Sequence, residues 1–186
     1  NPMETLKTNI NGTINILNQS IKNNAKHFIF ASTEWVYPNY KKTFDEGSKI
    51  NIDDLDNNYS ISKLIGEELI SNYSKHIKIS ILRFGIIYSN RKYGGAAVES
   101  LVRSVKNSNK ISIGSKKTSR RFVHIDDIIE GIYLSYKKQI PGIFNLAGDK
   151  DVSLNDILVL SQNLLNKKIS IIKIAKNKVN IRKVSN

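Results

Sequence analysis

Cysteine is absent from this sequence of 186 residues. Without a thiol, the chain has no disulfide framework, no thiolate metal site and no cysteine nucleophile. The three histidines, His27, His76 and His124, lie far apart in the sequence, so a histidine metal centre is not expected either. No apolar run approaches the length of a membrane span. These absences favour a cytoplasmic enzyme or binding domain that holds no metal.

Acidic residues are outnumbered by basic ones, 16 to 29, which gives a formal net charge of +13. Such a charge suits an anionic partner, for example a nucleic acid, a membrane surface or a phosphorylated small molecule. Residues 103–121 and the tail 167–186 both carry several basic residues and no acid. A solvated face is the simpler interpretation of each run, and neither run has an aromatic residue that could stack on bases. We therefore do not expect a nucleic acid or a membrane as partner, and RNA binding is kept only as an alternative.

Helical and strand-like patterns alternate along the chain. Apolar residues recur at helical spacing over 3–23, and Asn58 is expected to cap a second helix that runs over 58–76. Short apolar runs at 26–31 and at 78–88, the latter interrupted by Gly85, are typical of buried strands. The alternation continues with helices over 97–106, 126–136 and 153–165 and with strands over 110–113, 122–125, 143–147 and 169–174. Because the early strands are continuous apolar runs, the sequence predicts an α/β fold with a parallel sheet covered on both faces.

A strand ending in Thr33 is followed by Tyr59 and Lys63 at the start of a helix, and this is the most informative feature of the chain. Residues four apart share one helix face, so Lys63 is expected beside Tyr59. A phenol titrates at about pH 10, so a phenol that acts as a base near neutral pH needs a cation next to it. Tyr-x-x-x-Lys by itself is weak evidence, because it also begins at Tyr37, Tyr88 and Tyr133. The first two of these lie in expected turns or loops, and no strand ending in Ser or Thr precedes the third at a useful distance.

Several segments along the chain are informative because of their order and spacing. As they stand in this sequence, they are Asn1-Pro2 with residues 9–13 (NINGT), residues 30–37 (FASTEWVY), residues 59–63 (YSISK), residues 82–88 (LRFGIIY), residues 120–127 (RRFVHIDD), and residues 144–148 (FNLAG) with Ser153. Together they resemble the extended short-chain dehydrogenase/reductases, the NAD-dependent epimerase/dehydratase family, and in particular its nucleotide-sugar epimerases. Each segment is weak evidence alone, whereas the shared order is specific.

The resemblance implies a catalytic set of Thr33, Tyr59 and Lys63. Thr33 would hydrogen-bond the substrate hydroxyl, Tyr59 would take or give the proton, and Lys63 would hold the nicotinamide ribose. The cofactor would be NAD or NADP, and Asn9 and Gly85 would contact it together with the catalytic set.

The substrate implied by the resemblance is a nucleotide sugar, contacted by Glu34 and Arg120. Arginine suits this role because its guanidinium can bind a diphosphate with two parallel hydrogen bonds. His124, Asp126 and Asp127 are instead expected to form a turn and a helix start.

The implied architecture is a partial Rossmann-like, doubly wound parallel sheet with a small C-terminal α+β substrate lobe. Residues 1–88 would be the C-terminal half of the NAD-binding domain, and residues 89–186 would mainly form the substrate lobe, with 122–148 returning to the sheet. Helices 3–23 and 58–76 would pack against their copies in a homodimer. The family's glycine-rich turn, GxxGxxG, is missing from this sequence, so we expect a fragment that by itself binds NAD poorly.

Departures from the family pattern narrow the expected chemistry. Trp35 stands where 4,6-dehydratases and UDP-xylose-forming decarboxylases carry a glutamate, and the cysteine of GDP-fucose-forming epimerase/reductases is absent. Pro38, Ile86 and Arg121 replace a glycine, an asparagine and an aspartate of the family. A 4-epimerase-like transient oxidation is the leading hypothesis. The alternatives are an NAD(P)H-dependent keto-sugar reductase or dehydratase and a catalytically inactive, basic RNA-binding relative.

Overall fold

The computed structural model describes residues 1–39, 43–91, 94–113, 115–174 and 183–184. Its central layer is a sheet of three parallel strands in the order β1 (His27–Thr33), β3 (Lys78–Phe84) and β8 (Gly142–Leu146). The three strands end together, because Thr33 lies opposite Phe84 and Phe84 lies opposite Leu146. The α/β fold with a parallel sheet is therefore confirmed.

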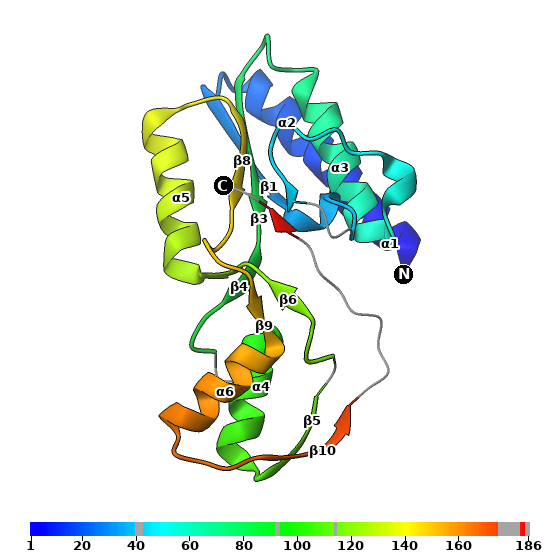
Figure 1. The fold of residues 1–186 in the computed structure, drawn as a ribbon. Helices are drawn as coiled ribbons and strands as arrows, with labels where there is room; N and C mark the ends of the chain where they lie inside the picture. The colour runs from blue at the N-terminus through cyan, green and yellow to red at the C-terminus, as the bar shows by residue number, and fades with distance from the viewer. Residues whose placement is uncertain (40–42, 92–93, 114, 175–182, 185–186) are drawn as a thin grey trace.

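Helices cover both faces of this sheet. The helices α2 (Gly12–Lys22) and α3 (Asn58–Ser71) lie on one side, and α5 (Ile125–Lys138) lies on the other (Figure 1). A buried apolar cluster joins the sheet to α2 and α3; its members are Leu17, Phe30, Ile70, Ile77, Ile79 and Ile81. Each such side chain contributes about 1.5–3 kcal/mol when fully buried, so this cluster is a main source of stability. Gly66 permits the close approach of α3, because a Cβ there would lie 2.9 Å from the Phe30 ring.

The first helical segment is one continuous run with a change of geometry in its middle. The helix α1 (Pro2–Leu6) passes into a π-helical turn, η1 (Lys7–Asn11), and then into α2. The single helix expected over 3–23 is thus correct in extent but wrong in geometry, since a π turn spaces its hydrogen bonds by one more residue. Such turns are common at functional sites, and this one contains Asn9.

The helix α3 differs at both ends from the helix expected over 58–76. Its N-cap is Asn57, whose side chain accepts a hydrogen bond from the Ser60 amide, and not Asn58. The helix ends at Ser71 instead of 76, and the chain turns into β3. Gly85 then separates β3 from β4 (Ile86–Tyr88), which pairs with β7 (Phe122–His124) outside the central sheet.

A second group of elements lies beyond the carboxyl ends of the strands (Figure 1). It comprises α4 (Ala97–Asn107), α6 (Leu154–Leu164), the parallel pair β5 (Lys110–Ile113) and β10 (Ser170–Ile174), and the antiparallel pair β6 (Ser119–Arg120) and β9 (Val152–Ser153). It has its own buried apolar cluster, which includes Leu101, Val105, Ile111 and Leu158. The cap predicted at Ser153 is present, and Asp156 completes a capping box with it.

Short elements complete the described chain: η2 (Glu34–Val36), β2 (Thr43–Phe44), η3 (Ile52–Asp54) and β11 (Lys183–Val184). β11 pairs with β2, and Val184 packs with Val36 and Phe44 in a third apolar cluster. Most of the basic tail after Ile174 lies outside the described residues. No helix within the described part of the chain is long and apolar enough to cross a membrane.

Candidate active site

The first turns of α3 lie against the carboxyl end of β1. Tyr59 is in the first turn, and 42% of its surface is exposed. One turn later, Lys63 donates a hydrogen bond from Nζ to the carbonyl oxygen of Ala31 at 2.9 Å. The same ammonium lies 4.9 Å from the centre of the Phe30 ring. The structure therefore brings the Lys63 ammonium to the end of the strand that carries Thr33, and Tyr59 lies one turn earlier on the same helix.

The environment of Lys63 disfavours its charge. Burial lowers the pKa of its ammonium, and the negative charge of Glu67 acts in the opposite direction. The ammonium has three N–H donors, and the Ala31 carbonyl takes one of them. A cation that is only partly hydrated at a strand end is well placed to bind hydroxyl groups of a ligand.

Thr33 is buried at the last position of β1. Its backbone is extended, and its side-chain oxygen accepts a hydrogen bond from the Trp35 amide at 3.3 Å. This contact caps the short helix η2 and fixes the position of the hydroxyl.

Asn9 is joined to α3 through a residue that the sequence did not single out. The Asn9 side chain donates from Nδ2 to the Ser62 hydroxyl at 2.9 Å, and Ser62 donates to the Tyr59 carbonyl at 2.8 Å. The π turn that contains Asn9 is thereby tied to the turn of α3 that contains Tyr59. Ser62 has no distinctive sequence signal, since a serine next to a lysine in a helix is common.

The other Tyr-x-x-x-Lys segments occupy different surroundings. Tyr133 and Lys137 lie on exposed α5, with the ammonium 5.9 Å from the ring centre. Tyr37 is fully buried, and Tyr88 contacts the His124 ring edge-on at 5.2 Å. The lysines that follow these last two tyrosines, at positions 41 and 92, lie outside the described residues. Of the pairs whose two members are described, Tyr59 and Lys63 are the one at a carboxyl end of the sheet, where ligands bind in open α/β folds.

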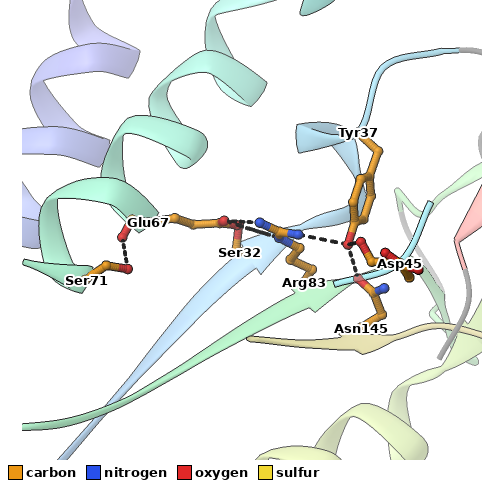
Figure 2. Close-up of polar contacts among 7 residues, drawn as sticks. All are labelled: Ser32, Tyr37, Asp45, Glu67, Ser71, Arg83 and Asn145. Carbon is orange, nitrogen blue, oxygen red and sulfur yellow. Dashed lines mark hydrogen bonds and ion pairs between the residues drawn. The ribbon is translucent and has the colours of Figure 1, made fainter. Parts of the chain in front are cut away.

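A row of polar side chains crosses the sheet one residue before this end. Ser32, Arg83 and Asn145 are direct neighbours on β1, β3 and β8. Arg83 forms an ion pair with Glu67 of α3, with Nη2 and Oε2 2.5 Å apart and with Nε 3.0 and 3.2 Å from the two carboxylate oxygens. Ser32 donates to the same carboxylate (Figure 2). Burial opposes the charge of Arg83, but the hydrogen bonds and charge of Glu67 prevail and raise its pKa.

The row continues through the Tyr37 phenol. Arg83 donates from Nη1 to its oxygen at 2.8 Å, and the phenol donates to the Asn145 side chain at 2.9 Å or to the Asp45 carbonyl at 3.0 Å. Burial raises the pKa of Tyr37, against the effect of Arg83, so the phenol stays neutral. Sequence reasoning missed this network, although a charged residue within the apolar run 78–88 was a signal for it.

Glu34 and Arg120, the two residues expected to contact the substrate, contact each other. Glu34 follows Thr33 in η2 and is 1% exposed, and Arg120 is buried in β6. The guanidinium Nε lies 3.4 Å from the carboxylate Oε1, and Nη1 donates to the Ser119 carbonyl at 2.8 Å. This ion pair joins the end of β1 to the second group of elements.

Two further candidates have structural explanations in the described chain. Gly85 packs so closely that a Cβ would lie 2.9 Å from the Arg121 carbonyl oxygen and 3.1 Å from the Ala147 Cβ. His124 caps α5 by accepting a hydrogen bond from the Asp126 amide, in agreement with its predicted structural role. The described residues contain no group of three or more His, Cys, Asp or Glu side chains that could hold a metal ion.

The chain is similar to known proteins over most of its length. The profile of the NAD dependent epimerase/dehydratase family matches residues 1–147. The chain is 30% identical over 173 residues to UDP-glucuronate 4-epimerase of Thermodesulfobacterium geofontis, covering 90% of this chain and 53% of that protein. It is 33% identical over 168 residues to a putative UDP-glucose 4-epimerase of Methanocaldococcus jannaschii, covering 84% of this chain and 53% of that one. The chain thus spans about half the length of the curated relatives it matches.

Solved structures show the same fold. ADP-L-glycero-D-manno-heptose-6-epimerase of Helicobacter pylori superposes with a TM-score of 0.86 at 23% identity, and the match covers 99% of this chain and 58% of that one.

Proposed function

Since the chain belongs to the NAD-dependent epimerase/dehydratase family, we propose that it is the catalytic part of an NAD(P)-dependent nucleotide-sugar 4-epimerase. The observation that carries this proposal is the placement of Tyr59 and Lys63 on one face of α3, with the Lys63 ammonium on the strand end that carries Thr33. Two of its similar relatives bear 4-epimerase names. Because the chain spans about half the length of these relatives, the substrate and cofactor proposals apply to a longer protein, of the relatives' full length.

The polar groups at the end of β1 fit the nicotinamide end of such a cofactor. Lys63 has N–H donors beyond the one taken by Ala31, and ribose hydroxyls are suitable acceptors. Asn9 lies beside the same turn of α3 through its bond to Ser62. When bound, NAD supplies the carbon that accepts a hydride from the sugar and returns it.

The chain's own residues then handle the proton. Tyr59 takes the proton of the sugar hydroxyl as the hydride leaves the carbon that bears it, so that the alcohol becomes a ketone. In the reverse step Tyr59 would return the proton to the same oxygen, and NAD, when bound, would supply the hydride to the opposite face of that carbon, which would restore an alcohol of inverted configuration. Lys63 stabilises the phenolate by its positive charge, and Thr33 orients the reacting hydroxyl by a hydrogen bond. Tyr59 thus ends the cycle with the proton state in which it began, and the sugar undergoes no net oxidation.

The test uses the longer protein with NAD and a panel of UDP- and GDP-sugars. We expect 4-epimer formation without net formation of NADH. Tyr59→Phe should lower the rate of 4-epimer formation by at least about a hundredfold, because it removes the general acid–base. Tyr133→Phe is the matched control, because it removes the same hydroxyl from an exposed Tyr-x-x-x-Lys segment. Activity that survives Tyr59→Phe would exclude this mechanism. In a parallel assay with NAD(P)H and a nucleotide keto-sugar, stoichiometric consumption of NAD(P)H would instead identify a keto-sugar reductase.

A further inference from the structure

Helix α3 contacts β1 through two polar side chains that lie one helical turn apart. Lys63 binds the Ala31 carbonyl at 2.9 Å, and the Glu67 carboxylate accepts a hydrogen bond from the Ser32 hydroxyl. The two strand residues are consecutive and directly precede Thr33. The close approach that Gly66 permits between helix and strand lets both side chains reach the strand end.

Glu67 is itself held in place. The residue is 2% exposed, and its carboxylate accepts hydrogen bonds from both Nε and Nη2 of Arg83, which comes from the middle strand (Figure 2). The Arg83 guanidinium is held in turn by the Tyr37 phenol at 2.8 Å. A carboxylate bound in this two-pronged way has a fixed direction, so the Ser32 hydroxyl has a fixed acceptor.

Packing alone does not account for these charges. Two apolar side chains of similar volume would fill the same space, and replacing a buried ion pair in this way is often neutral or stabilising. What the carboxylate adds is direction toward Ser32 and negative charge near Lys63, which opposes the loss of the Lys63 charge on burial. Tyr59, Lys63 and Glu67 follow one another at four-residue spacing, so this charge lies on the face of α3 that carries the candidate catalytic groups.

Resting on the proposed function, we propose that Glu67 is a positioning residue for the reaction. Through Ser32 it fixes the strand end that presents Thr33, and through its charge it holds the Lys63 ammonium at that same strand end. It contacts neither substrate nor cofactor, and it acts through the residues that do.

The first test follows the titration of Lys63 in this chain by NMR of 13C-labelled lysine, with Lys63→Arg to assign the signal. Glu67→Gln keeps the size of the side chain and removes its charge, so we expect a lower pKa for Lys63. Glu99→Gln is the matched control, because Glu99 is also a buried carboxylate paired with an arginine, Arg91, but lies in α4. The control should leave the Lys63 midpoint unchanged. A folded Glu67→Gln variant with an unchanged midpoint overturns the proposal.

Glu67→Asp replaces Glu67→Gln if the latter does not fold. It retains the charge but withdraws the carboxylate by one methylene, so we expect a smaller downward shift of the Lys63 midpoint. An unchanged midpoint in this variant overturns the proposal as well.

The second test measures kinetics in the longer protein with NAD and its sugar substrate. We expect Glu67→Gln to lower kcat by about tenfold or more with little change in KM, because a small displacement of catalytic groups is costly. An unchanged kcat in a variant whose Lys63 midpoint has moved overturns the role in the reaction. The two proposals fail differently: survival of activity in Tyr59→Phe rejects the proposed function, whereas the Lys63 titration needs no activity.

Discussion

Arg83→Met is the substitution for which the structure predicts the largest loss of stability in the polar row. Methionine fills much of the volume but leaves the Glu67 carboxylate buried with the Ser32 hydroxyl as its remaining described donor. Removing one partner of a buried pair costs about 3–5 kcal/mol. That is a large part of the total stability of a domain, which is about 5–15 kcal/mol.

The double variant Arg83→Met/Glu67→Leu separates charge from packing. With both charges gone, the remaining cost is that of the unpaired Ser32 hydroxyl and the weakened Tyr37 bonding, about 1–3 kcal/mol. Because this cost is smaller, the double variant should be more stable than Arg83→Met alone. The free energy of unfolding of each variant is measured by urea unfolding, followed by circular dichroism and by the fluorescence of Trp35, the only tryptophan.

Arg91→Met is the control for this series. Arg91 pairs with Glu99, but 49% of the arginine side chain is exposed and Glu99 also accepts from the Ser89 and Ala96 amides. Its loss should cost less than about 1 kcal/mol. If Arg83→Met costs no more than Arg91→Met, or if the double variant is less stable than the single one, the buried charges do not have the energetic role assigned here.

Three further predictions concern pH, the cofactor and assembly. Burial, and secondarily the charge of Lys78, lowers the pKa of His27. The contribution of His27 to the free energy of unfolding is therefore fully present above the pKa of the unfolded state, about 6.5, and is lost as the pH falls through the lower pKa of the folded state. The urea midpoint should drop on acidification, and it should drop less in His27→Gln. This chain alone should bind NAD more weakly than the low micromolar range, and tighter binding in calorimetry would contradict an incomplete cofactor site. The chain should form a dimer by light scattering through the helices expected over 3–23 and 58–76, which correspond to the run from α1 to α2 and to α3. Ile16→Lys, at a position that is 62% exposed on α2, should shift the dimer to monomer, and a monomeric wild type would refute this prediction.

Local sequence patterns were sufficient to predict the central layer of the fold. The apolar run 78–88 identified β3, and the helical spacing after Asn58 identified α3, because both signals depend on residues that are close in sequence. The cap of α3 was misplaced by one residue, since Asn57 and Asn58 are equally good capping residues and tertiary structure selects between them. The π turn at Lys7–Asn11 was missed because the four-residue spacing of Leu6, Ile10 and Ile14 is also typical of an ordinary α-helix.

In the candidate site, too, the sequence predicted relations between residues close in the chain but not those that depend on tertiary structure. Tyr59 and Lys63 were recognisable because their relation is a fixed spacing on one helix. Glu34 and Arg120 were selected by resemblance, but no pattern indicated that they pair, since they are brought together only when β6 packs near η2. Their contact with a substrate stays a prediction.

The polar row illustrates why such contacts escape local patterns. Arg83 looks anomalous in an apolar strand until the register of the sheet is known, because Ser32 and Asn145 become its neighbours only through the pairing of β1, β3 and β8. The row lies one residue before the strand ends, directly beneath the level of Thr33. Helix α3 therefore binds the sheet through Glu67 on the same face that presents Tyr59 and Lys63. A substitution that loosens this packing must also displace the candidate catalytic groups, so stability and activity are expected to change together at this helix and to separate elsewhere.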